Sequence, residues 1–117
     1  MTPEGYVVKS CLDYLAVRGI YAWRSNTGVA RPERRDGSRG FVRFGHVGSA
    51  DILGVMPGGR FLGIECKAPR GNLSRHQLEF GQRVRADGGI YMVVRSVDDL
   101  IEQLQELENL AAPEGRV

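Results

Sequence analysis

Cysteine is scarce in this chain, long apolar runs are missing, and each shortage excludes a class of protein. Cys11 and Cys66 are the two cysteines among 117 residues, which do not make a disulfide framework or a zinc-ligand spacing. No apolar run approaches the roughly 18 residues needed to cross a bilayer, so we expect no membrane partner. The first residues lack the basic, apolar and small-residue progression of a secretory signal. We therefore expect a cytoplasmic protein.

Positive charge is scarce at the end of the chain, where residues 97–117 hold one basic and six acidic side chains. Residues 1–50 carry a net charge of +4, residues 51–96 carry +3, and residues 97–117 carry −5. A basic region of this size is expected when the partner is a polyanion, and the acidic end fits a solvated helix face. The length lies in the commonest range for domains, so we expect a single domain over residues 1–117.

Two short segments, 51–56 and 60–65, read as the strands of a β-hairpin, because a three-residue loop with two glycines separates them. If the two residues that flank the loop pair with each other, paired residue numbers sum to 116. This register places Asp51 directly opposite Glu65.

Opposed carboxylates and a nearby amine predict a metal site at this hairpin. Directly opposed residues have Cβ atoms roughly 4.5–5.5 Å apart, and like charges in such a pair destabilise the sheet. The pair Asp51 and Glu65 is most plausible with a cation between the two side chains. Lys67 follows Glu65 by two residues and therefore shares its face. The three residues predict a cation site with a proton-handling group.

Two further polar residues stand at predicted helix starts, and each has a structural alternative. Thr2 is a good N-cap, so Glu4 lies in a first turn. There it either interacts with the helix dipole or reaches toward the hairpin as a third acid. Ser74 and Gln77 fit a capping box, yet Gln77 also lies on a helical stripe that could face the acids. The sequence leaves both alternatives open for both residues.

The stretch 25–40 has no periodicity and predicts a long, arginine-rich loop. Guanidinium groups match phosphate oxygens, so we expect arginines here and nearby to contact the phosphates of a polyanion; the alternative is a solvated loop. Gly48, just before Asp51, would allow another backbone, such as a nucleic-acid strand, to approach closely. The arginines predicted to contact nucleic-acid phosphates are Arg24, Arg31, Arg34, Arg35, Arg39, Arg43, Arg70 and Arg75.

The order of predicted elements is helix, strand, hairpin, helix, strand, helix, which indicates an α/β domain. The run 90–94 is continuously apolar and reads as a strand buried on both faces. A last helix begins after Ser96, and we expect the tail 111–117 to fray.

Three segments carry a resemblance to a known family: GSADI at 48–52, IECK at 64–67 and LSRHQ at 73–77. With them the chain resembles the virus-type replication-repair nuclease (VRR-NUC) domain of the PD-(D/E)XK nuclease superfamily, in a minimal stand-alone form such as phages encode. Ala50 stands where the superfamily has its name-giving proline, which is not a ligand. The resemblance implies a restriction-endonuclease-like α/β core, with a small mixed sheet, a central hairpin and flanking helices.

The resemblance also implies a Mg²⁺-dependent DNA endonuclease, with Mn²⁺ as an expected substitute. Asp51, Glu65 and the main-chain carbonyl of Cys66 would hold the metal, and Lys67 would orient or activate the attacking water. Gln77 and Glu4 occupy positions of auxiliary active-site residues.

The expected activity is structure-selective cleavage of branched DNA by a homodimer, as in Holliday-junction resolvases, in the bacterial host cytoplasm if a phage encodes the chain. Two alternatives stay open. One is a restriction-type or nicking endonuclease with a sequence preference, and the other is a non-catalytic nucleic-acid-binding module of the same fold.

Overall fold

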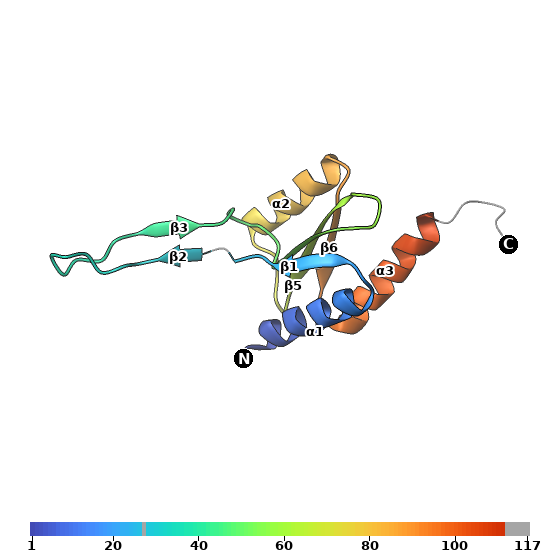
Figure 1. Cartoon of the computed structure of the whole chain (residues 1–117), viewed down its shortest axis with the longest axis horizontal. Helices are drawn as coiled ribbons and strands as arrows, with labels where there is room; N and C mark the ends of the chain where they lie inside the picture. Colours follow the sequence, from blue (N-terminus) through green and yellow to red (C-terminus); the bar gives the residue numbers. More distant parts are fainter. Residues whose placement is uncertain (27, 112–117) are drawn as a thin grey trace.

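The computed structural model describes residues 1–26 and 28–111, with the backbone alone for residues 28–30 and 42–44. Its centre is a four-stranded sheet in the order β1-β4-β5-β6, with helices on both faces (Figure 1). The β1–β4 and β4–β5 pairs are antiparallel and the β5–β6 pair is parallel. The fold is therefore mixed α/β, as expected. Its elements are α1 (Pro3–Val17), β1 (Tyr21–Arg24), β2 (Gly28–Ala30), β3 (Val42–Phe44), β4 (Ile52–Val55), β5 (Phe61–Cys66), α2 (Arg75–Ala86), β6 (Ile90–Val94) and α3 (Val97–Ala111).

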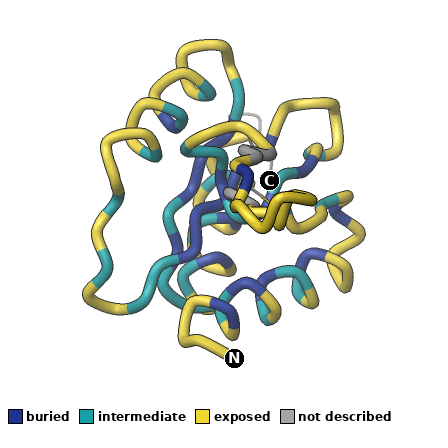
Figure 2. The backbone as a smooth tube through the Cα atoms, turned by 90° about the vertical axis from the view of Figure 1, so that its left-hand side faces the viewer, coloured by how far each residue is buried: buried dark blue, intermediate teal, exposed yellow. Residues whose placement is uncertain are grey.

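The hydrophobic core lies between the sheet and helices α1 and α3, so the strands are the most buried part of the backbone (Figure 2). Leu62, Ile64 and Cys66 of β5 all belong to this core. Because side chains alternate along a strand, Glu65 points to the other face, where α2 packs on β5 and β6. The alternation thus sends one acid of the predicted pair away from the main core.

The predicted helix starts are confirmed. The hydroxyl oxygens of Thr2, Ser74 and Ser96 each accept a backbone N–H from three residues further on, at 3.0, 3.2 and 3.1 Å. The last helix runs to Ala111, and the rest of the tail predicted to fray (111–117) lies outside the described residues. None of the helices described is long and apolar enough to cross a membrane.

The predicted loop at 25–40 is wrong in part, because the chain forms a two-stranded antiparallel ribbon there. Strand β2 pairs with β3, and the ribbon projects away from the sheet (Figure 1). Nearer the turn, the Gly40 N–H donates to the Pro32 carbonyl at 2.7 Å. Residues 31–39 are exposed, so no apolar alternation marks this part of the ribbon in the sequence.

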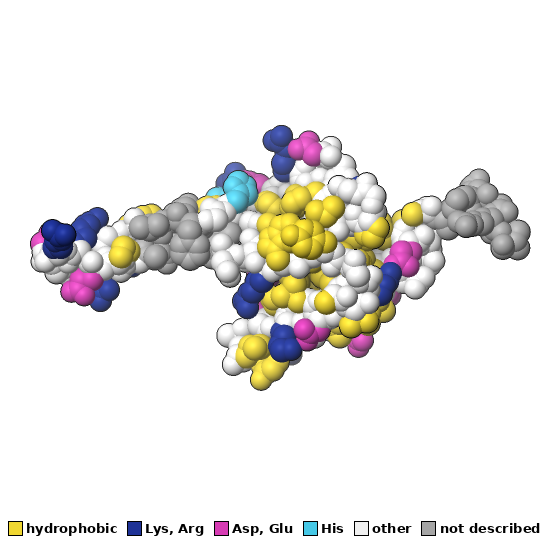
Figure 3. All heavy atoms as spheres, in the orientation of Figure 1, with side chains coloured by type: hydrophobic (Ala, Val, Ile, Leu, Met, Phe, Trp, Pro, Cys, Tyr) yellow, Lys and Arg dark blue, Asp and Glu magenta, His cyan; other side chains and the backbone are white. Residues whose placement is uncertain are grey.

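Helix α2 leaves β1 and β4 uncovered on its side of the sheet. Tyr21, Trp23 and Val55 are 72%, 42% and 37% exposed, and by register Tyr21 and Val55 are cross-strand neighbours. Figure 3 shows an apolar patch over this part of the molecule. Helices α1 and α3 therefore cover one side of the sheet, and α2 covers only part of the other side.

We expect Gly81→Ala to destabilise the protein, although alanine ordinarily favours a helix over glycine by about 1 kcal/mol. A Cβ at Gly81 would lie 2.6 Å from two ring carbons of Tyr91. Either α2 or the ring must move, at a cost of about 1–3 kcal/mol. Urea unfolding measures the effect, with the exposed neighbour Gln82→Ala as control. A midpoint equal to that of the control would show that α2 does not pack this closely.

Candidate metal centre

The β4–β5 hairpin has the predicted register. Ile52 pairs with Ile64, so paired residue numbers sum to 116. The same register, continued by one residue, sets Asp51 across from Glu65. Both acidic side chains lie on the α2 face, since each is one residue out of phase with the buried Ile52 and Ile64.

Asp51 is held through both its main chain and its side chain. Its carbonyl accepts the N–H of Ser25 at 2.8 Å, and its Oδ2 accepts the N–H of Cys66 at 2.8 Å. The N–H and C=O of a strand residue point to the same neighbouring strand. The Cys66 carbonyl, predicted as a metal ligand, is therefore directed to the side on which Asp51 lies.

Glu65 is a buried acid with one oxygen engaged and one without a partner. Its residue is 2% exposed. Oε1 accepts a hydrogen bond from the Gln77 side chain at 3.0 Å and lies 3.9 Å from Nζ of Lys67. Oε2 is buried and has no hydrogen-bond partner among the described residues. An unpartnered buried acceptor costs about 1–3 kcal/mol, and more if charged, so this oxygen fits a site for a cation.

The surroundings of Glu65 raise the pKa of its carboxyl group to about 8. Burial is the largest cause, because removal from water disfavours the charged form. The Asp51 carboxylate raises the pKa further, first by repulsion and then by a side-chain hydrogen bond that favours the protonated form of Glu65. The Lys67 ammonium lowers the pKa, and Glu4 adds a smaller repulsion. In the absence of a cation, Glu65 is therefore mostly protonated at pH 7.

Gln77 fills both of the roles that the sequence left open. Its Oε1 accepts the N–H of Ser74 at 2.8 Å, which completes the capping box of α2. Its Nε2 donates to Glu65 at 3.0 Å. A primary amide carries an acceptor at one end and donors at the other, so the two roles do not compete. The start of α2 is thereby tied to the buried acid.

Lys67 and Glu4 lie near the acid pair in different ways. The Lys67 side chain is 12% exposed and shares the face of Glu65, and its N–H donates to the Val94 carbonyl at 2.9 Å. Glu4 is exposed in the first turn of α1 and affects Glu65 through its charge alone. Lys67 is thus part of the centre, whereas Glu4 lies at its periphery.

The ligand set suits a hard cation. Asp51, Glu65 and the Cys66 carbonyl all offer oxygen, which Mg²⁺ prefers, and Mg²⁺ is usually bound through one or two carboxylates while it keeps several waters. Within the described residues, no group of three His, Cys, Asp or Glu side chains is arranged to hold a metal. The candidate set here is two carboxylates and one main-chain carbonyl, so water would have to supply the remaining ligands of a bound cation.

Four of the eight arginines predicted to bind DNA lie together, but away from the centre. They occupy the far end of the β2–β3 ribbon, where their residues are exposed and basic side chains gather (Figure 3). These four are Arg31, Arg34, Arg35 and Arg39.

The other four arginines are dispersed. Arg24 pairs with Ile52 and so lies on the face of β1 opposite to that of the acids. Arg70 is exposed in the turn after β5. Arg75 forms an ion pair with Glu79 of its own helix at 2.9 Å. The side chain of Arg43 lies outside the described residues.

Sequence reasoning missed Arg95, which holds the turn between Lys67 and α2. Its guanidinium donates to the carbonyl oxygens of Ala68 at 2.8 Å and Gly71 at 2.7 Å. No sequence signal could have indicated this role, because main-chain carbonyls are present at every residue. Arg95 therefore affects the centre indirectly, because it positions the turn that follows Lys67.

Gly48 packs closely against the backbone of α2. Its φ is +80°, and a Cβ there would lie 2.4 Å from the carbonyl oxygen of His76. The close approach expected of a nucleic-acid strand is therefore made by the first turn of α2. Gly48 brings the segment before Asp51 against the helix that supplies Gln77.

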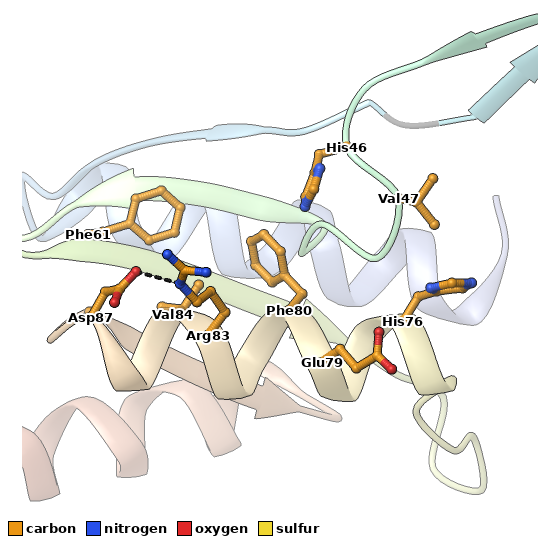
Figure 4. Close-up of a pocket in the computed structure, with 10 residues that line it drawn as sticks. His46, Val47, Phe61, His76, Glu79, Phe80, Arg83, Val84 and Asp87 are labelled. Carbon is orange, nitrogen blue, oxygen red and sulfur yellow. Dashed lines mark hydrogen bonds and ion pairs between the residues drawn. The ribbon is translucent and has the colours of Figure 1, made fainter.

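A cavity of about 540 Å³ lies between α2 and the segment before β4 (Figure 4). Phe61 and Phe80 line it, and the His46 ring lies 6.0 Å from the ring of Phe80. An ion pair of Arg83 with Asp87 at 2.7 Å stands at one end. None of the acids of the metal centre lines this cavity, so it is separate from the centre.

In EDTA, the protein should lose stability as pH rises from about 4.5 to 8. Over this range native Glu65 keeps a proton that the unfolded chain, with an ordinary pKa of 4.5, has released. Rising pH therefore favours unfolding, by on the order of a few kcal/mol, since one pKa unit is worth about 1.4 kcal/mol. Urea unfolding at pH 5 and pH 8.5 measures this slope. Glu65→Gln should reduce it and the exposed Glu79→Gln should not; equal slopes in all three proteins would contradict the prediction.

Changes at Gln77 should separate its two roles. Gln77→Glu keeps a capping-box residue but sets a second carboxylate against Glu65, whereas Ser74→Ala removes the cap alone, at about 1 kcal/mol. We expect Gln77→Glu to be the more destabilising change at pH 8 in EDTA, and much less so at pH 5, where the carboxyl groups hold protons. Thermal unfolding at both pH values measures this. Wild-type stability of Gln77→Glu at pH 8 would show that the amide does not support Glu65.

Comparisons with protein-family models, curated proteins and solved structures give no match to this chain. The resemblance to the VRR-NUC domain therefore stays a prediction from the residues themselves. What the structure shows is a mixed α/β fold in which one hairpin and one helix start bring Asp51, Glu65, Lys67 and Gln77 together.

Proposed function

We propose that this chain is a Mg²⁺-dependent endonuclease of the PD-(D/E)XK type that hydrolyses phosphodiester bonds in DNA. One observation carries the proposal. Glu65 is buried beside Asp51, and its Oε2 has no partner among the described residues. Its Oε1 accepts a hydrogen bond from Gln77 and forms an ion pair with Lys67. A carboxylate used only for structure would gain from a hydrogen bond at both oxygens, so the free oxygen supports a ligand role.

Some residues of the centre would hold the metal, and others orient the side chains that hold it. When bound, Mg²⁺ supplies charge neutralisation at the phosphoryl oxygens and makes a bound water more acidic. Asp51 and Glu65, with the Cys66 carbonyl, are the groups that would hold it. Gln77 engages Oε1 of Glu65 and so leaves Oε2 as the oxygen available for the metal. The Cys66 N–H donates to Oδ2 of Asp51 and so orients that carboxylate, which leaves Oδ1 for the metal.

Lys67 supplies a positive charge beside the two acids. Its ammonium group lies 3.9 Å from Glu65 Oε1, where it can stabilise hydroxide or the charge that develops on the phosphoryl group. Over the reaction, the water oxygen forms a new bond to phosphorus and one P–O ester bond breaks. The proton released by the water ends on the leaving oxygen, so one water is added in total.

The charge distribution favours DNA as the substrate. Residues 1–96 carry a net charge of +7, the sum of +4 and +3 for the segments 1–50 and 51–96, and basic surfaces attract polyanions. We further propose a structure-selective activity on branched DNA by a homodimer, because one centre cuts one strand and a junction needs two related cuts. The resemblance of segments 48–52, 64–67 and 73–77 to the VRR-NUC family supports this proposal.

Glu65→Gln should abolish Mg²⁺-dependent cleavage, and Lys67→Ala should lower it by about 10²–10³-fold. The matched control, Glu79→Gln, should cut like the wild type, because Glu79 is exposed on α2. Labelled linear, flapped and four-way DNA is incubated with Mg²⁺, Mn²⁺ or EDTA, and the products are mapped. Cleavage that survives in both centre variants would overturn the catalytic assignment.

The same assay decides the remaining questions about the activity. Paired cuts in opposed strands of the four-way substrate support a homodimer, and single cuts count against it. Cleavage that follows sequence instead of branching identifies a restriction-type or nicking enzyme. Salt-sensitive binding with no cleavage under any metal condition identifies a binding module.

A further inference from the structure

The far end of the β2–β3 ribbon is ordered by its own hydrogen bonds. We call residues 31–41 the ribbon tip. The Arg34 N–H donates to the Ser38 carbonyl at 2.7 Å, and the Gly37 N–H donates to the Arg34 carbonyl at 3.0 Å. Asp36 Oδ1 accepts both the N–H and the hydroxyl of Ser38, at 2.9 and 2.6 Å. The tip therefore holds a defined turn although it projects away from the sheet (Figure 1).

The chemistry of the ribbon tip is that of an anion-binding surface. It contains four arginines and two acids, a net charge of +2. Asp36 is engaged by Ser38, and Glu33 lies across the ribbon from Arg39. The Arg31 guanidinium lies 5.5 Å from the ring centroid of Phe41, which is 53% exposed. All residues of the tip except Gly40 are exposed, so its charges and its aromatic ring face outward.

The base of the ribbon is tied to the metal centre. The Ser25 N–H donates to the carbonyl of Asp51, and the Ser25 and Ser49 hydroxyls lie 3.5 Å apart. From Phe44 to Gly37 the chain advances about 23 Å at roughly 3.3 Å per residue, and seven further residues lead to Asp51. The tip thus lies about 25–40 Å from the acids, on the order of one turn of B-DNA, about 34 Å.

We propose that the ribbon tip lies in a groove of duplex DNA about one helical turn from the bond to be cut. The DNA major groove is about 12 Å wide and admits a two-stranded β-ribbon, and arginines beside it reach phosphates on its walls. This inference rests on the proposed nuclease function for the position of the cut. It identifies the substrate as DNA with a duplex arm of about one turn on one side of that bond.

Duplex DNA fits this surface better than single strands do. Proteins that bind single strands present several aromatic rings along a basic groove, whereas the tip has one exposed ring, and that ring already carries an arginine. The arginines also lie on both legs of a turn, Arg31, Arg34 and Arg35 on one side of Gly37 and Arg39 on the other. Such a ribbon can contact two phosphate backbones at once.

The test measures binding in EDTA, where no cleavage interferes. The variant Arg34→Ala/Arg35→Ala/Arg39→Ala is compared with the charge-matched control Lys9→Ala/Arg60→Ala/Arg83→Ala, whose residues are exposed and lie outside the ribbon. Fluorescence anisotropy is recorded with labelled duplexes of 8 and 24 base pairs and with a 24-nucleotide single strand, at several salt concentrations. Circular dichroism verifies that each variant keeps its fold.

We expect the ribbon variant to bind the 24-base-pair duplex at least 10-fold more weakly than the wild type, with a salt slope smaller by about 2–3, since each phosphate contact contributes about 0.9. The control should lose less, and its salt slope should change little. The wild type should prefer 24 to 8 base pairs, and the ribbon variant should lose that preference.

Three results would overturn the proposal. These are equal losses in the ribbon variant and the control, a length preference that survives in the ribbon variant, and wild-type binding to the single strand as tight as to the 24-base-pair duplex. A protein that binds as expected but never cuts would leave the ribbon assignment intact and contradict the nuclease proposal alone.

Discussion

At the end of the β4–β5 hairpin, in the middle of the sheet, Glu65 is buried with one carboxyl oxygen that has no partner among the described residues. Its neighbours Asp51, Lys67 and Gln77 are arranged around it. Burial and the charge of Asp51 disfavour ionisation of Glu65. Gln77 and Lys67 offset part of this cost at Oε1, and nothing described does so at Oε2. A divalent cation would offset the repulsion between Glu65 and Asp51 and would give Oε2 a partner. The proposed chemistry thus follows from the free energy of one side chain.

The elements that meet at this point are coupled through short contacts. The amide of Gln77 joins the helix start to the acid, and the close approach of Gly48 to His76 brings the segment before Asp51 to the same turn of α2. Arg95 donates hydrogen bonds to the turn between β5 and α2. A shift of α2 would therefore change the position of the Glu65 oxygens. Packing of α2 on the sheet and the chemistry of the centre depend on each other.

Short-range sequence patterns correctly predicted the hairpin register and the helix starts. The hairpin register followed from a period of two and a short glycine loop, and the helix starts followed from Thr2, Ser74 and Ser96. The pairing of the ribbon was missed because residues 31–39, which connect its two strands, are exposed and carry no apolar alternation. The eight arginines were grouped as one surface, yet the structure separates Arg24 and Arg75 from the ribbon tip, since sequence distance says little about distance in space.

The sequence by itself determined which residues carry charge and which pair of acids lies in register, because strand alternation and hairpin pairing are short-range properties. Only the tertiary structure decided that Gln77 both caps α2 and binds Glu65, and that one Glu65 oxygen is left unpartnered among the described residues. Those outcomes depend on how α2 packs across β5 and β6. That packing brings together residues far apart in the chain, and burial there sets the pKa of the acid.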